Sequence, residues 1–224
     1  MKKYSRGVSA GEALANAWIN EQKKMQLIDY NASVFFQQII EQKDAVYFEF
    51  PMKNGALGYT QVDEYGISIM INDSIENQER KNFTIAHEIG HLLFHVDRSK
   101  TFQSYIETKK NLVIFDNEFK NELQEVEANA FAAHLLLPDK VLKYQLLSSM
   151  NAYQIKRISG ISIVALRWRI TQYLVKFKKI PHKEALEIAD EFTNKYKNVD
   201  ASKTTLYEAI KEFKSIKPLY NFMH

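Results

Sequence analysis

Two histidines and a glutamate, His87, Glu88 and His91, are the residues in this sequence with the clearest potential for chemistry. On a helix, residues four apart lie about one turn apart on one face, so both imidazoles can reach a single ion. Glu88 is offset from His87 by roughly 100° and can face the open coordination position of that ion. Such a site lowers the pKa of a zinc-bound water to about 7, and a neighbouring carboxylate can take its proton. The spacing therefore predicts a hydrolytic zinc site with Glu88 as the general base.

A catalytic zinc ion usually has three protein ligands, so a third must come from elsewhere in the chain. The candidates are Glu125, Glu127, His95 and His134. Glu125 and Asn129 are four residues apart, so one helix face could offer a carboxylate to the metal and an amide to a ligand imidazole. Glu127 lies about 200° around that helix from Glu125, so both cannot serve. His95 lies a further turn beyond His91, about 6 Å along the helix, and His134 is expected on the helix surface or the substrate side.

Helical periodicity predicts the two helices that would carry these residues. One spans residues 79–95 and contains the histidine motif, and the other spans residues 117–137 and contains the candidate carboxylates. Pro138 ends the second helix, because proline lacks an amide hydrogen and disfavours helical geometry in the residue before it. Ala86 and Gly90 form a notch of small side chains, so another backbone is expected to approach the first helix closely.

A small sheet is predicted just upstream of the histidine motif. Three short segments have strand-like composition and are separated by turn-forming residues at positions 54–55 and at Gly66. These strands cover residues 45–50, 58–62 and 67–71. Two helices are expected before them, one with Ser9 and Glu12 as a capping box and one that begins at Asn31. The predicted fold class is therefore α+β, with a small antiparallel sheet, an active-site helix and a glutamate helix, followed by a helical C-terminal region.

The region after Pro138 is basic at its start. Between Lys140 and Lys183 there are ten basic residues and no Asp or Glu. Within it, a helix over residues 152–158, a break at Gly160 and a helix over residues 162–177 give a helix-turn-helix pattern. Three interpretations are open: contacts with DNA phosphates, docking of a substrate protein, and a solvated face over a helical scaffold.

Composition limits the class of protein. The 224 residues carry a net charge of +3 and are 46% hydrophobic, which is typical of a folded globular chain. The absence of cysteine excludes disulfides and thiolate metal sites. Neither an export signal nor a run of about 18 apolar residues is recognisable. We therefore expect a cytoplasmic protein.

The sequence closely resembles the ImmA/IrrE family of metallopeptidases in two linked segments, FTIAHEIGHLLFH and EVEANAFAAHLLLP. The similarity extends over about residues 31–174. It implies a zincin-like fold for this part. For the whole chain we expect a zincin-like domain over residues 1–138, with an N-terminal helical extension, and a basic helical C-terminal region over residues 139–224. Residue by residue, the resemblance implies Zn²⁺ ligands, a general base and a residue that supports a ligand: His87, His91 and Glu125; Glu88; and Asn129.

The resemblance also implies a function and a partner. Known relatives are regulatory proteases that cut a helix-turn-helix repressor encoded beside them, in mobile genetic elements or in stress responses. We therefore expect a zinc-dependent metallo-endopeptidase with a protein substrate, in which Tyr144 and His134 are candidates for stabilising the oxyanion. Two alternatives belong to other classes: a DNA-binding regulator with a structural or vestigial metal site, and a protein that sequesters its partner without cutting it.

Overall fold

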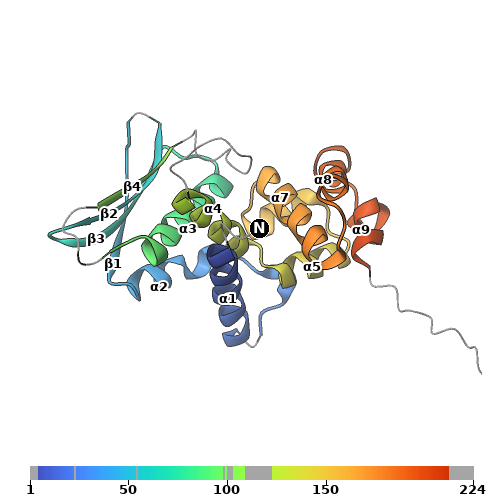
Figure 1. Cartoon of the computed structure of the whole chain (residues 1–224), viewed down its shortest axis with the longest axis horizontal. Coiled ribbons are helices and arrows are strands. Elements are labelled where there is room, and N and C mark those ends of the chain that lie inside the picture. The colour runs from blue at the N-terminus through green and yellow to red at the C-terminus, as the bar shows by residue number, and fades with distance from the viewer. Residues whose placement is uncertain are drawn as a thin grey trace, which may run out of the picture.

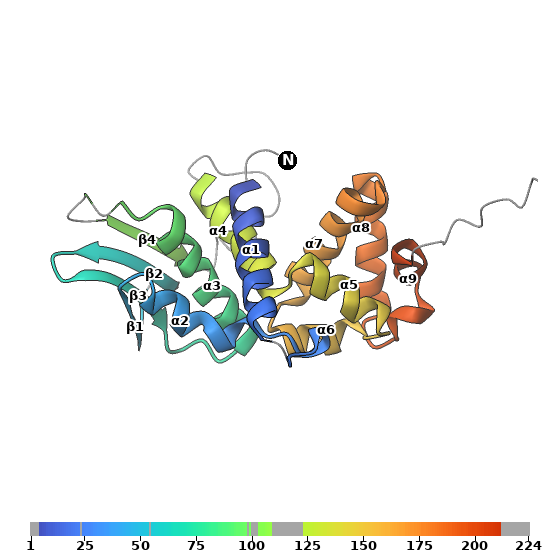
Figure 2. The same ribbon diagram turned by 90° about the horizontal axis from the view of Figure 1, so that it is seen from below.

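The computed structural model describes residues 5–22, 24–53, 55–97, 99, 103–108 and 123–211. It confirms the predicted α+β fold. A small sheet lies at one end of the molecule and a group of C-terminal helices at the other, with three long helices between them (Figures 1 and 2). None of the helices in these ranges is long and apolar enough to cross a membrane.

The sheet has four strands in the order β1-β3-β2-β4. These strands are β1 (Ala45–Phe50), β2 (Ala56–Asp63), β3 (Gly66–Asn72) and β4 (Gln103–Thr108). The three predicted strands are confirmed, but the prediction of a wholly antiparallel sheet is wrong. Strand β2 is antiparallel to β3 and β4, whereas β1 is parallel to β3. The chain reverses direction twice, before and after β2, so β1 and β3 point the same way; β4 was not predicted.

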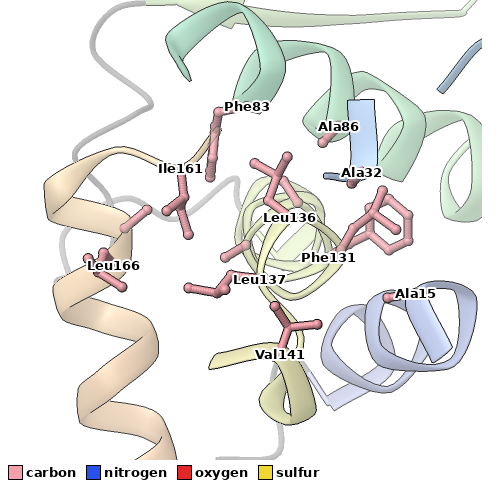
Figure 3. Close-up of a cluster of buried hydrophobic side chains, with 14 of the residues drawn as sticks. Ala15, Ala32, Phe83, Ala86, Phe131, Leu136, Leu137, Val141, Ile161 and Leu166 are labelled. Carbon is pink, nitrogen blue, oxygen red and sulfur yellow. The ribbon is translucent and has the colours of Figure 1, made fainter. Parts of the chain in front are cut away.

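Two long helices connect the sheet to the centre of the molecule. Helix α3 (Gln78–Phe94) contacts the sheet strands and carries the histidine motif, and the side chain of Asn77 caps its first turn by accepting from the Arg80 amide. Helix α4 (Leu123–Leu136) packs along α3. Both helices agree with the prediction, although residues 117–122 of the second predicted helix lie outside the described residues. The C-terminal end of α4 is enclosed by side chains from α3 and other helices (Figure 3).

Small residues set how closely the helices approach one another. A Cβ added at Gly90 would lie 3.0 Å from the Ala128 Cα of α4, which confirms the predicted notch on α3. Helix α1 (Ser5–Glu21) packs on the other side of α4 through glycines of its own. A Cβ added at Gly7 would lie 2.2 Å from the Glu127 carbonyl oxygen. Helix α4 is therefore held between two helices at close backbone contact.

The N-terminal helices differ in detail from the prediction. The capping box at Ser9 and Glu12 is wrong, because α1 already begins at Ser5 and both residues lie inside it. The Glu12 carboxylate instead accepts from the Asp139 amide, 2.9 Å from Oε1. The cap at Asn31 is confirmed, since its side chain accepts from the Ser33 amide. It opens a 3₁₀ turn that continues into α2 (Phe36–Glu41).

The C-terminal region is helical, as predicted. Its helices are α5 (Asp139–Leu147), α6 (Ala152–Ser159), α7 (Ile163–Tyr173), α8 (His182–Asp190) and α9 (Thr205–Ile210). Gly160 has a φ of +65°, which ends α6, and Ser162 caps α7 by accepting from the Ala165 amide. The predicted helix-turn-helix pattern is therefore present as α6 and α7. The division of the chain at Pro138 into two regions stays a prediction.

A buried polar cluster, formed by Glu12, His134, Asp139 and Arg169, joins α1, α4, α5 and α7. The guanidinium of Arg169 is fully buried and lies 2.7 Å from an Asp139 oxygen and 3.2 Å from a Glu12 oxygen. Its Nε also donates to the Leu137 carbonyl, at 2.9 Å. His134 lies 2.6 Å from Glu12 and 3.0 Å from Arg169. Arg169 therefore has a structural role inside the protein, and the interpretation of the basic residues as a solvated face is wrong for this residue.

Acid is expected to destabilise the protein as the pH falls from 6.5 towards 4. Burial, followed by the charge of Arg169, lowers the pKa of His134 from 6.5 to about 4. Within that window the unfolded chain binds a proton that the folded chain does not. The free energy of unfolding therefore decreases as the pH decreases, by about 1.4 kcal/mol per pH unit for one such group.

Denaturant unfolding of the metal-free protein across this pH window tests the expectation. In the His134→Gln variant, the dependence of the unfolding free energy on pH should be weaker by the contribution of about one proton. A His134→Gln variant with the wild-type slope would contradict a buried, neutral imidazole.

Candidate metal centre

Three predicted ligands come together between α3 and α4. His87 and His91 are fully buried, and their Nε2 atoms are 2.9 Å apart. The Glu125 carboxylate, from the first turn of α4, lies 3.3 Å from His87 Nε2 and 3.2 Å from His91 Nε2. One potential ligand atom from each residue lies within 4.8 Å of the others. Two nitrogens and a carboxylate oxygen are thus placed where a single cation could bind all three.

A hydrogen bond at Nδ1 of His87 orients its ring for metal binding through Nε2. Its Nδ1 lies 2.9 Å from the Asn129 side-chain oxygen, as the i, i+4 relation of Asn129 to Glu125 predicts. That oxygen can only accept, so Nδ1 carries the proton and donates. Nε2 of the neutral ring then has a lone pair directed at the centre. Asn129 therefore selects the tautomer that a metal-binding histidine needs.

The electrostatics of the three residues suit a cation. Burial lowers the pKa of His91 to about 4, so the ring is neutral near pH 7. Glu125 Oε2 is buried and accepts no hydrogen bond from the described residues. A carboxylate and two neutral imidazoles with acceptor atoms turned together fit a divalent metal ion.

Glu88 follows His87 on α3, and its side chain is buried against strand β2. The Thr60 hydroxyl donates to its Oε2 at 2.5 Å. Strand β2 can pass this close because residue 58 is glycine: a Cβ there would lie 2.7 Å from Glu88 Oε1 and 2.7 Å from Thr84 Cγ2. Thr60 and Gly58 were missed from the sequence, although a glycine inside a strand is a known sign of close approach. Together they fix where the carboxylate of Glu88 can lie.

The Gly58→Ala variant should therefore displace the Glu88 carboxylate. Overpacking of this kind costs about 1–3 kcal/mol of unfolding free energy, and we expect a fall in any hydrolytic activity along with it. The Gln61→Ala variant, on the same strand, is the control for a general weakening of β2. Wild-type activity and stability in Gly58→Ala would contradict the tight fit between β2 and α3.

The other ligand candidates lie elsewhere. His95 and Glu127 contact each other at 3.2 Å, on the far side of His91. His134 lies nine residues beyond Glu125 on α4, about 13 Å along the helix, and belongs to the buried cluster with Arg169. Glu12, His134 and Asp139 could geometrically hold a metal, but the guanidinium of Arg169 already occupies the position of a cation there. His134 is therefore neither a third ligand nor placed to stabilise an oxyanion.

Tyr105 of β4 is a further residue that sequence reasoning missed. Its ring stacks on the His91 imidazole at 4.8 Å, with 21° between the planes, and its hydroxyl donates to the His95 carbonyl at 2.5 Å. The predicted candidate Tyr144 lies instead on α5, half exposed. Strand β4 thus supplies one wall of the candidate centre.

Comparison with known proteins places the chain in a family. Residues 40–171, more than half of the chain, match the peptidase family M78, described as the IrrE N-terminal-like domain. A curated relative, "Uncharacterized immunity region protein 2" of Bacillus phage phi105, is 34% identical over 86 residues, which is 38% of this chain and 48% of the relative. The chain thus matches about half the length of that relative. The resemblance to ImmA/IrrE is confirmed, and the chain belongs to the IrrE N-terminal-like peptidase family, M78.

Proposed function

We propose that this protein is a zinc-dependent metallo-endopeptidase with His87, His91 and Glu125 as zinc ligands and Glu88 as the general base. The observation that carries the proposal is the convergence of two buried Nε2 atoms and one carboxylate within 3.3 Å of each other. A centre of two histidines and one glutamate, with a fourth position open for water, is the ligand set of a hydrolytic zinc site.

The residues of the chain have separate roles in the proposed reaction. A zinc ion held there supplies the Lewis acidity that activates water and polarises the scissile carbonyl. Glu88 takes a proton from the attacking water and delivers it to the leaving amine. Thr60 donates to Glu88 Oε2 and holds the carboxylate in one orientation, while Asn129 holds the His87 ring. The barrier is lowered because acid, base and ligands are in place before the substrate arrives.

We further propose a regulatory role, with a helix-turn-helix transcriptional repressor as the protein substrate. Support comes from the curated relative, whose name places it in a phage immunity region. Because a repressor acts on DNA inside the cell, this substrate also implies action in the cytoplasm. Salt bridges disfavour the DNA-binding alternative: Lys156 pairs with Glu79, Arg167 with Asp190, and the Arg169 guanidinium is buried.

Incubation with the helix-turn-helix protein encoded nearest to this gene tests the proposal. We expect limited cleavage, seen as two fragments by mass spectrometry, that stops with a chelator and returns with added zinc. The His87→Ala variant, which lacks one proposed ligand, should be inactive. An intact repressor after incubation with the zinc-loaded protein would argue against this substrate, and a protein that binds no zinc would overturn the enzyme proposal.

A further inference from the structure

A chain of polar contacts continues from His91 away from the proposed zinc ligands. His91 Nδ1 lies 2.9 Å from His95 Nδ1, and His95 Nε2 lies 3.2 Å from Glu127 Oε2. Glu127 in turn accepts two hydrogen bonds from Arg6, at 2.9 Å from Nε and 2.7 Å from Nη2. These contacts join α3, α4 and α1. His95 and Glu127 were candidate ligands in the sequence. In the structure His95 instead contacts the proposed ligand His91, and Glu127 contacts His95.

The chemistry of these groups fixes the direction of the hydrogen bonds. The Glu127 carboxylate can only accept, so His95 Nε2 carries a proton and donates to it. The neutral His95 ring then has its lone pair at Nδ1 and accepts from His91 Nδ1. This leaves the lone pair of His91 at Nε2, which faces His87 and Glu125. The hydrogen bonds that run from Glu127 through His95 therefore select for His91 the same tautomer that Asn129 selects for His87.

Arg6 anchors this chain from the N-terminal helix. Besides its two bonds to Glu127, its guanidinium lies 4.9 Å from the centre of the Phe94 ring and donates to the Phe94 carbonyl at 3.3 Å. The neighbouring Gly7 lets α1 approach the backbone of Glu127, where a Cβ would lie 2.2 Å from the carbonyl oxygen. Helix α1 precedes residues 40–171, the part that matches the family. An element outside the family match thus contacts the support of the proposed zinc ligand.

We propose that His95 and Glu127 are positioning residues for the zinc ligand His91, and that Arg6 of α1 completes this support by holding Glu127. The inference rests on the proposed zinc site. Residues that orient a metal-bound histidine typically contribute 10–100-fold to metal affinity. Breaking these hydrogen bonds should therefore weaken zinc binding by about that factor. Helix α1 then has a role at the reaction centre without contributing a ligand.

Zinc affinity, measured by competition with a chromogenic chelator, tests the role of His95. His95→Phe keeps a ring of similar size but neither accepts from His91 nor donates to Glu127, and we expect about 10–100-fold weaker binding. His95→Gln offers both an amide oxygen and an amide hydrogen, so it should keep most of the affinity. His182→Phe, on the exposed face of α8, is the control and should bind as the wild type does.

Two further variants test the roles of Glu127 and Arg6 and cover the case in which His95→Phe does not fold. Glu127→Leu removes the acceptor and should weaken zinc binding to a similar extent. Arg6→Met should weaken it by a smaller factor, whereas the control Arg157→Met, exposed on α6, should have no effect. Unfolding midpoints of the metal-free forms show whether a variant has lost affinity only because it has lost stability.

The outcomes separate this inference from the proposal on which it rests. Weak binding by His95→Phe and Glu127→Leu, with near wild-type binding by His95→Gln, supports the positioning role. Equal affinities of His95→Phe and the wild type would overturn it and leave the zinc site intact, and so would an equal loss in the Phe and Gln variants. A wild-type protein that binds no zinc would instead remove the proposed function itself.

Discussion

Replacing Glu88 by Gln is expected to lower the rate of peptide cleavage by about 10²–10⁴-fold, the usual contribution of a general base. Glutamine has the shape of glutamate but cannot take a proton from water. Its amide oxygen can still accept from the Thr60 hydroxyl, which now bonds to Glu88 at 2.5 Å, so the side chain should keep its place. Zinc affinity should therefore stay near the wild-type value while cleavage is lost.

The Glu79→Gln variant is the matched control for Glu88→Gln. Glu79 lies in the first turn of the same helix and pairs with Lys156 at 3.1 Å, so its loss should leave cleavage unchanged. Cleavage is followed as the initial rate on the repressor, and zinc content is measured on the same samples. Full activity of Glu88→Gln would rule out Glu88 as the base and favour a protein that acts by binding its partner.

The Arg169→Met variant should lose about 3–5 kcal/mol of unfolding free energy, because removing one member of a buried ion pair leaves the other charge uncompensated. The side chain of Arg169 is fully buried, and its guanidinium contacts the carboxylates of Glu12 and Asp139. Met has a similar length and fills most of the space. Lys176 still pairs with Asp139 at 2.9 Å, so the loss measures mainly the missing ion pair with Glu12 and the missing hydrogen bonds of the guanidinium.

Arg167→Met, two residues earlier on α7, is the control for this loss. Arg167 pairs with Asp190 at 2.9 Å, but its side chain is 38% exposed, so its removal should cost less than about 1 kcal/mol. Denaturant unfolding of both variants gives the comparison. Adding Asp139→Asn to Arg169→Met should recover part of the stability; equal losses in the two arginine variants would contradict a structural role for the buried cluster.

Two of the proposed zinc ligands, His87 and His91, could be predicted from their spacing alone, whereas the third, Glu125, was singled out among four candidates only by the resemblance to a family. His87 and His91 lie one turn apart on one helix, and Asn129 lies one turn from Glu125 on another. Thr60, Tyr105 and Arg6 could not be found in this way. Thr60 contacts Glu88, Tyr105 contacts His91, and Arg6 is connected to His91 only through Glu127 and His95. They lie on three different elements, and no spacing along the sequence connects them to the centre.

The errors in the fold prediction have a related cause. Glu12 has the sequence pattern of a capping residue, but its partners are His134, Asp139 and Arg169, more than a hundred residues away. Strand β1 pairs with β3 and not with β2, which follows it along the sequence, and short strands of similar composition do not encode that order. Local periodicity therefore predicted most of the elements but not β4, and long-range packing decided their partners.

Helix α4 connects the two ends of the molecule through one rigid rod. It carries Glu125 and Asn129 at the candidate centre and His134 at the buried cluster, and side chains from several helices enclose its C-terminal half (Figure 3). Leu136 and Glu125 lie on the same helix, so a substitution beside Leu136 that moved α4 as a whole would also move the carboxylate of Glu125. Natural selection for a tightly packed interior and for turnover would thus act on the same fourteen residues.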